Sequence, residues 1–190
     1  MPSRVSGLVL AAGGSSRLGR PKQLLPFGDA TLLDHTLGVA RACGFHQLVC
    51  VLGGGAAEVR SVVDLRGIDV VVNEVFGSGC SSSIAASLDA VTGDVLVLLL
   101  GDQPGVSPAA VRALVAGRGD ADLAVCRYDD GRGHPFAFAR PVFGELAALH
   151  GDKAVWKLLD ARGATEVRVA GAVPLDVDTW ADYEAVLAAS

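Results

Sequence analysis

The fold of this chain is decided by one stretch near its N-terminus, Leu8-Val9-Leu10-Ala11-Ala12-Gly13-Gly14-Ser15-Ser16-Arg17-Leu18-Gly19-Arg20-Pro21-Lys22. The apolar run Val5–Ala11 predicts a buried strand, which gives way to small residues ahead of two cations, Arg17 and Lys22. Small residues let backbone N–H groups approach phosphate oxygens, and Arg and Lys neutralise phosphate charge. We therefore expect a triphosphate-binding loop whose nucleotide contacts are Leu10, Ala11, Ala12, Gly13, Gly14, Ser15, Ser16, Arg17 and Lys22.

Two other phosphate-binding loops are excluded by the spacing of this stretch. A Walker loop requires Gly-Lys-Ser/Thr, but Gly19 is followed by Arg20-Pro21-Lys22-Gln23. A dinucleotide fingerprint requires G-x-G-x-x-G at the start of a helix. The glycines here miss that spacing, and Pro21 keeps Arg20 out of the helical region. The loop is neither a P-loop nor a dinucleotide-binding turn.

The stretch resembles the signature L-A-A-G-x-S-x-R-x-G-x-x-K-x-L-L-P of nucleotidyltransferases that have a GT-A-like α/β fold. The matching residues are Leu10-Ala11-Ala12-Gly13, Ser15, Arg17, Gly19, Lys22 and Leu24-Leu25-Pro26. Within that superfamily the chain resembles the MobA-like NTP transferases, and among them the molybdenum cofactor cytidylyltransferases. The resemblance runs from Leu8 to the terminal helix. It implies transfer of CMP from CTP to molybdopterin cofactor, with release of pyrophosphate.

Composition sets the outer limits. The 190 residues suit one domain, 1–190, and the hydrophobic fraction of 51% argues against disorder. The longest apolar run, Val95–Leu100, is far shorter than the ~20 residues of a membrane span, and Met1–Ser6 has no signal-peptide pattern. The net charge of −5 argues against a nucleic-acid partner. The four cysteines lack a C-x-x-C spacing, so we expect neither a zinc site nor a disulfide framework. We expect a cytoplasmic protein with no membrane partner.

Strand and helix patterns alternate along the chain. The amphipathic stretch Leu32–Cys43 predicts a helix with Thr31 as its N-cap and Gly44 as its stop. Further strands are predicted over 47–52 and 69–72, with a helix between them. This alternation predicts an α/β domain with a mostly parallel central sheet flanked by helices on both faces. The resemblance makes it a GT-A/Rossmann-like nucleotidyltransferase fold.

The central strand of that sheet is predicted at Asp94–Leu100, because it is apolar on both faces. Asp102 follows at once, and open α/β sheets place ligand chemistry just beyond the carboxyl ends of their strands. Alone, Asp-x-Pro is more often a turn. Beside a triphosphate loop it gains a function, because Mg²⁺ takes one or two carboxylates plus phosphate oxygens. We expect Asp102 to be a catalytic, nucleotide-binding and metal-ligating residue.

A polar loop over 73–83 precedes a helix predicted at Ser82–Ala90. Serines at a helix start either cap it or hold a base edge or an anion. The family carries a similar G-x-S-S-S loop against the nucleobase. By that resemblance the further nucleotide contacts are Asn73, Gly79, Ser82 and Ser83. Ala12, where guanylyl-transferring relatives tend to have a second glycine, favours a pyrimidine base.

The acceptor side of the site is expected from two segments that resemble the family. Gly-His-Pro at 133–135 implies that His134 contacts the acceptor, although a structural histidine fits the residues equally well. Gly-Asp-Lys at 151–153 implies that Lys153 touches phosphate, while Asp152 is a plausible N-cap for a helix over 154–161.

The last segment of interest is Asp176-x-Asp178-Thr179, which leads into a helix from Trp180. Alternation along an extended strand puts both carboxylates on one side, about 7 Å apart. The residues alone favour capping of the helix by Asp178 or Thr179. The family's D-x-D-T segment supplies the second metal ligand, which we assign to Asp178 before Asp176. The acceptor contacts are then expected to be Gln103, His134, Lys153 and Asp176.

These residues suit an in-line transfer at the α-phosphorus of a nucleoside triphosphate bound with Mg²⁺. Arg17 and Lys22 would stabilise charge on the α-phosphate and on pyrophosphate, and Asp102 and Asp178 would hold the metal. The leading hypothesis is transfer of CMP to the phosphate of molybdopterin. A sugar 1-phosphate or another phosphorylated acceptor is the alternative. A non-catalytic module that delivers nucleotide or cofactor to a molybdoenzyme or its chaperone is the third.

Overall fold

A seven-stranded sheet forms the middle layer of the molecule, whose computed structural model describes residues 3–15 and 17–189. Ser16, a predicted nucleotide contact, lies outside the described residues. The strand order is β5-β4-β1-β6-β8-β7-β9. All pairings are parallel except those of β8 with β6 and β7. The strands are β1 (Val5–Ala11), β4 (Gln47–Leu52), β5 (Asp69–Val72), β6 (Val95–Leu100), β7 (Leu123–Arg127), β8 (Arg132–Ala139) and β9 (Thr165–Arg168).

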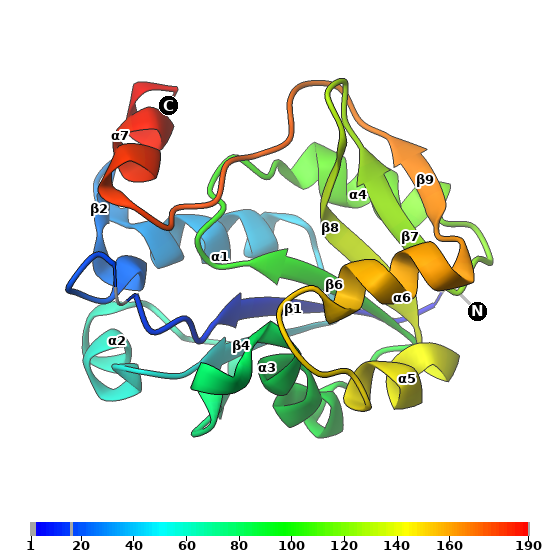
Figure 1. Ribbon diagram of the computed structural model, residues 1–190, viewed down its shortest axis with the longest axis horizontal. Coiled ribbons are helices and arrows are strands. Elements are labelled where there is room, and N and C mark those ends of the chain that lie inside the picture. Colours follow the sequence, from blue (N-terminus) through cyan, green and yellow to red (C-terminus); the bar gives the residue numbers. More distant parts are fainter. Residues whose placement is uncertain (1–2, 16, 190) are drawn as a thin grey trace.

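Helices cover both faces of the sheet, as predicted (Figure 1). One face packs on α1 (Leu32–Ala42), α2 (Ala56–Val62) and α4 (Pro108–Gly117). The other packs on α3 (Cys80–Ser87), α5 (Phe143–Ala147) and α6 (Ala154–Arg162). The terminal helix α7 (Trp180–Ala188) joins a third cluster with Leu18, Leu25 and Leu32, beside a two-strand hairpin of β2 (Pro26–Phe27) and β3 (Ala30–Thr31). Within the part of the chain described, no helix has the length and apolar character to cross a membrane.

Local signals in the sequence set the element boundaries. Thr31 caps α1, because its Oγ1 accepts a hydrogen bond from the Asp34 N–H at 3.1 Å and the Asp34 carboxylate accepts one from the Thr31 N–H. Gly44 ends the helix with a φ of 72°, a conformation that glycine adopts without strain. The central position predicted for the strand before Asp102 is confirmed, since β6 is the fourth of seven strands and is buried along nearly its whole length.

One predicted helix has different bounds in the structure. The helix expected at 82–90 begins two residues earlier, at Cys80, and is completed by a 3-10 turn over Leu88–Ala90. A further 3-10 turn, over Arg140–Val142, leads directly into the short α5.

The predicted capping of α6 by Asp152 is wrong. Lys153 occupies the N-cap position and makes no side-chain capping bond. The Asp152 carboxylate instead accepts a hydrogen bond from the Cys80 N–H at 3.0 Å. The first N–H groups of a helix have no partner within the helix, so Asp152 supplies one at the start of α3 and caps a distant helix in place of its own.

Residues 170–178, which we call the strap, return from β9 to α7 across the carboxyl ends of the strands. Figure 1 shows this segment in orange running over the top of the molecule. Its first part is held by the β7–β8 turn, where Asp129 and Gly171 exchange two hydrogen bonds of 2.9 and 3.0 Å. Its last part is held by the Val177 N–H, which donates to the Asp102 carbonyl at 3.0 Å. The strap thereby brings Asp176 and Asp178 to the end of β6.

Candidate active site

A cavity of about 590 Å³ lies where β1 and β6 end, and we call it the central cavity. Parallel strands deliver their following loops to one edge of the sheet, which explains why segments distant in sequence meet there. Most of the predicted site residues line it: Leu10, Ala11, Ala12, Gly13, Gly14, Ser15, Arg17, Lys22, Gly79, Ser83, Asp102, His134, Asp176 and Asp178. Four described residues from the prediction do not: Asn73, Ser82, Gln103 and Lys153.

The loop after β1 is held in shape by its own side chains. Ser15 adopts a left-handed backbone with φ of 49°, and its Oγ accepts a hydrogen bond from the Lys22 N–H at 2.9 Å. The buried Gln23 donates from Nε2 to the carbonyls of Ala11 and Gly13, at 2.6 and 3.2 Å. Gln23 also lines the cavity and was missed in the sequence analysis. The sequence offers one signal for this role, namely that Gln23 is a polar residue directly before the apolar pair Leu24-Leu25.

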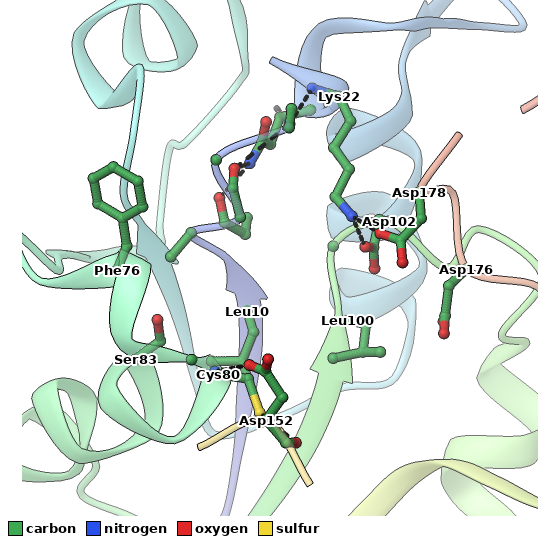
Figure 2. A pocket seen from close by; sticks show the side chains of 18 of the residues that line it. Leu10, Lys22, Phe76, Cys80, Ser83, Leu100, Asp102, Asp152, Asp176 and Asp178 are labelled. Carbon is green, nitrogen blue, oxygen red and sulfur yellow. Dashed lines mark hydrogen bonds and ion pairs between the residues drawn. The ribbon is translucent and has the colours of Figure 1, made fainter. Parts of the chain in front are cut away.

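Opposite charges meet at one end of the central cavity, as Figure 2 shows. The Lys22 Nζ donates to Asp178 Oδ1 at 2.8 Å and forms a second ion pair with Asp102. Burial acts to lower the pKa of Lys22, but the charges and hydrogen bonds of the two carboxylates outweigh it and raise that pKa. Lys22 is therefore a cation with two anionic partners. The more exposed Arg17 lies 3.9 Å from Asp178 at the same end.

The donor set at this end of the cavity fits a divalent cation. Asp102 and Asp178 converge on a single cationic group, so their oxygens already face a common point. In the described residues, no three side chains of His, Cys, Asp or Glu gather tightly enough to hold a metal by themselves. Mg²⁺ and Mn²⁺ take oxygen ligands and are commonly held by one or two carboxylates together with substrate phosphates. The pair fits a metal that arrives with a nucleotide.

Asp176, the neighbouring carboxylate, is in a different environment. Its Oδ1 accepts a hydrogen bond from the Gln103 Nε2 at 2.9 Å. Burial raises the pKa of Asp176 to about 6, and the negative charges of Asp102 and Asp178 add to the rise.

The start of α3 is built around a buried asparagine. Asn73 donates from Nδ2 to the hydroxyl oxygens of Ser82 and Ser83, each at 2.9 Å. The Ser82 hydroxyl in turn donates to the Gly79 carbonyl at 2.8 Å. Asn73 and Ser82 thus hold the helix start from behind, while Ser83 and Gly79 line the cavity.

Phe76 is a cavity-lining residue that the sequence analysis did not single out. It packs on the glycines that follow β4, where a Cβ on Gly53 or Gly54 would lie within 2.9 Å of the Phe76 side chain. The same Cβ on Gly53 would lie 2.4 Å from the Ala12 carbonyl oxygen. The glycines are required for this close approach of ring and backbone.

Three aromatic side chains in the lining of the central cavity pack together, and we call them the aromatic wall. The rings of His134 and Phe136 stack with centroids 3.9 Å apart, and Trp156 meets Phe136 edge-on at 4.8 Å. Burial lowers the pKa of His134 to about 3, so its imidazole is neutral at physiological pH. Lys153 is exposed at the start of α6 and lies outside the cavity lining, which does not support its predicted phosphate contact.

The glycine-rich loop with its two cations and the paired carboxylates form a site that suits a nucleoside triphosphate bound with a divalent metal. Residues 7–167 match the model of the MobA-like NTP transferase domain. The chain belongs to this family and is by that membership a nucleotidyltransferase.

Two relatives show how far the similarity extends. Nicotine blue oxidoreductase of Paenarthrobacter nicotinovorans is 35% identical over 140 residues, which cover 69% of this chain and 69% of that protein. Bifunctional protein GlmU of Dinoroseobacter shibae is 33% identical over 171 residues, which cover 85% of this chain. The match covers 35% of GlmU, so this chain spans about a third of that relative's length.

The solved structures of Rv0371c from Mycobacterium tuberculosis H37Rv are similar along the whole chain. One is 51% identical, covers 99% of both chains and superposes with a TM-score of 0.94. A complex of Rv0371c with manganese is 49% identical, covers 98% of this chain and all of that one, and has a TM-score of 0.90. Nucleotidyltransferases of this family use divalent metals.

Proposed function

We propose that this protein transfers CMP from CTP to the phosphate of molybdopterin, with Mg²⁺ as its metal and pyrophosphate as the second product. The observation that carries the proposal is that one cavity brings together two sets of side chains. Lys22 forms ion pairs there with Asp102 and Asp178, and the partly exposed rings of His134 and Trp156 pack on the buried Phe136 in the same lining. A triphosphate with its metal requires the first set, and a planar acceptor suits the second.

In this reaction an oxygen of the acceptor phosphate attacks the α-phosphorus of CTP. The bond from that phosphorus to the oxygen bridging to the β-phosphorus breaks, and pyrophosphate leaves with the electron pair. Arg17 and Lys22 neutralise the charge that develops on the transferred and leaving phosphates. Asp102 and Asp178 would hold the metal, which supplies further charge neutralisation when bound. The loop braced by Gln23 orients the triphosphate, so positioning does most of the work.

The choice of acceptor rests on the aromatic wall. The partly exposed rings of His134 and Trp156 pack on the buried ring of Phe136 and offer apolar area of the kind that a flat heteroaromatic ring covers. The neutral His134 adds polar ring nitrogens without a charge. A sugar 1-phosphate would also find apolar contacts there and remains the alternative acceptor. The choice of CTP rests on Ala12, which lines the cavity at a position where guanylyl-transferring relatives tend to have glycine.

A second candidate comes from the relative in P. nicotinovorans, whose name is that of an oxidoreductase. The aromatic wall of the central cavity favours this candidate as well, because a planar aromatic substrate suits it. It predicts a redox reaction of a planar substrate with an electron donor, for which NADH and NADPH serve as probes. It does not require the convergence of Lys22 with Asp102 and Asp178.

The test is pyrophosphate release with Mg²⁺, using CTP, GTP, ATP and UTP in turn against molybdopterin and a panel of sugar 1-phosphates. Release with CTP and molybdopterin alone is the expected result, and Asp102→Asn should lower it by about 10²-fold or more. Thr31→Ala, outside the cavity lining, is the control. Release with a sugar phosphate would replace the acceptor. Nucleotide binding with no release for any pair would indicate a binding module, and NADH or NADPH oxidation in a parallel assay would indicate the oxidoreductase.

A further inference from the structure

Gln103 is a buried glutamine whose side-chain amide donates hydrogen bonds to two residues of the strap. Only 2% of the residue is exposed, and it does not line the central cavity. Its Nε2 donates to the Pro174 carbonyl at 2.8 Å and to Asp176 Oδ1 at 2.9 Å. Both partners accept hydrogen bonds only, so the amide cannot be turned over without setting its oxygen against two other oxygens. The acceptor contact predicted for Gln103 is therefore replaced by two contacts within the protein.

The segment after β6 holds the strap at further points. The Asp102 carbonyl accepts from the Val177 N–H at 3.0 Å, and a Cβ on Gly105 would lie 3.3 Å from the Pro174 side chain. These contacts and the Gln103 amide act on strap residues 174, 176 and 177. Together they fix the position of the strap relative to the carboxyl end of β6, where Asp102 lies.

The two strap carboxylates consequently have different partners. Asp178 reaches the Lys22 amine and faces Asp102, whereas Asp176 is bound by Gln103. Figure 2 shows Asp102 and Asp178 turned toward the Lys22 amine and the Asp176 carboxylate turned away from it. Two residues apart on an extended strap, either carboxylate has the reach to face Asp102. Gln103 donates to Asp176, and Lys22 donates to Asp178.

We propose that Gln103 is a positioning residue that selects the second metal ligand: by binding Asp176 it leaves Asp178 to face Asp102. This inference rests on the metal site of the proposed function and deepens it. Side chains that orient metal ligands through hydrogen bonds govern metal affinity without touching the ion, and their loss commonly costs 10- to 100-fold. The buried Oε1 of Gln103 has no hydrogen-bond partner, while Nε2 makes two hydrogen bonds to the strap. An unpaired buried oxygen costs free energy, so this orientation of the amide supports the assignment.

The test is the affinity for Mn²⁺ measured by electron paramagnetic resonance in the presence of CTP and without acceptor, so that no turnover is needed. Gln103→Met removes both donors at similar length and should weaken Mn²⁺ binding at least about tenfold. Asp178→Asn should weaken it at least as much. Asp176→Asn keeps an oxygen that accepts from Gln103, and it should change the affinity less than about twofold. Thr31→Ala controls for unspecific loss of stability.

Substitutions that exchange the donor and the acceptor between residues 103 and 176 distinguish a positioning role of Gln103 from a role in fold stability alone. Gln103→Glu sets a carboxylate against Asp176 and should weaken Mn²⁺ binding more than Gln103→Met. Adding Asp176→Asn to that variant restores a donor–acceptor pair across the same 2.9 Å contact, and it should recover at least threefold in affinity. Far-ultraviolet circular dichroism on each variant identifies any that fail to fold. The Asp176→Asn comparison stands independently of those.

Wild-type affinity in a folded Gln103→Met variant would overturn the inference, and so would Asp176→Asn losing as much affinity as Asp178→Asn. Failure of the wild type to bind Mn²⁺ with CTP would instead refute the proposed metal site, and the inference with it.

Discussion

Replacing Lys22 with methionine removes the ammonium that two carboxylates share and keeps most of its apolar length. Asp102 and Asp178 are then left facing each other with their common partner gone. We expect the variant to be less stable and nearly inactive, and we expect a divalent cation to restore part of the stability because it can take over the role of the ammonium.

The size of the effect follows from burial. Removing one partner of a fully buried ion pair costs about 3–5 kcal/mol. Here the side chains of Lys22 and Asp102 are 11% and 17% exposed, but that of Asp178 is 49% exposed and is free to turn to solvent. We therefore expect a loss of about 2 kcal/mol in the free energy of unfolding. For a chain of this length that lowers Tm by about 4–8 °C, and the rate of transfer should fall about 10²-fold or more.

The assay is calorimetric Tm with and without MgCl₂ at matched ionic strength, with Lys157→Met as the control because Lys157 is an exposed lysine on α6. Mg²⁺ should raise the Tm of Lys22→Met by several degrees more than it raises that of the wild type. If Lys22→Met had the wild-type Tm, or if Mg²⁺ stabilised both proteins equally, the shared-cation account would be refuted.

Three further predictions concern the scaffold and the aromatic wall. Thr31→Ala should lower stability by about 1 kcal/mol, measured as a Tm about 2–4 °C lower, with turnover unchanged; a loss of turnover would contradict it. Gly53→Ala should cost about 1–3 kcal/mol and weaken CTP binding in calorimetric titration, because its Cβ would lie 2.4 Å from the Ala12 carbonyl oxygen; unchanged binding would show that the loop yields without consequence. His134→Gln should remove one contribution to the pH dependence of the free energy of unfolding. The folded-state pKa of His134 is about 3 against 6.5 unfolded, so the unfolded chain takes up the proton first and stability falls as pH drops through that window. From about pH 7.5 to about pH 5.5 the wild type should lose about 1.4 kcal/mol relative to His134→Gln in urea unfolding, and parallel curves would contradict the assigned burial. The raised pKa of Asp176 acts in the opposite direction, adding stability as pH falls through about 6, and cancels in the comparison because both proteins carry it.

The elements that the sequence predicted correctly are those with local causes. Thr31 and Gly44 bound α1 through contacts within a few residues, and the apolar run before Asp102 is a central strand because both its faces need cover. The meeting of Lys22 with Asp102 was also predictable, since parallel strands end at the same edge of a sheet.

The parts that sequence reasoning missed depend on distant partners. Asp152 caps a helix whose first residue, Cys80, is 72 residues away, and Gln103 binds Asp176 across 73 residues. A cap or an amide bond of this kind leaves no periodic or spacing signal. Lys153 shows the converse, because its segment resembles an acceptor-side motif while its side chain lies outside the cavity lining.

Transfer of label from CTP carrying ³²P at the α-phosphorus tests the central claim most directly, because it separates transfer from hydrolysis. Incubated with Mg²⁺ and molybdopterin, the wild type should place the label in a cytidine–pterin dinucleotide identified by mass, and Asp102→Asn should not. Label appearing only as free CMP, or in a product of another acceptor while molybdopterin is left unlabelled, would contradict the account.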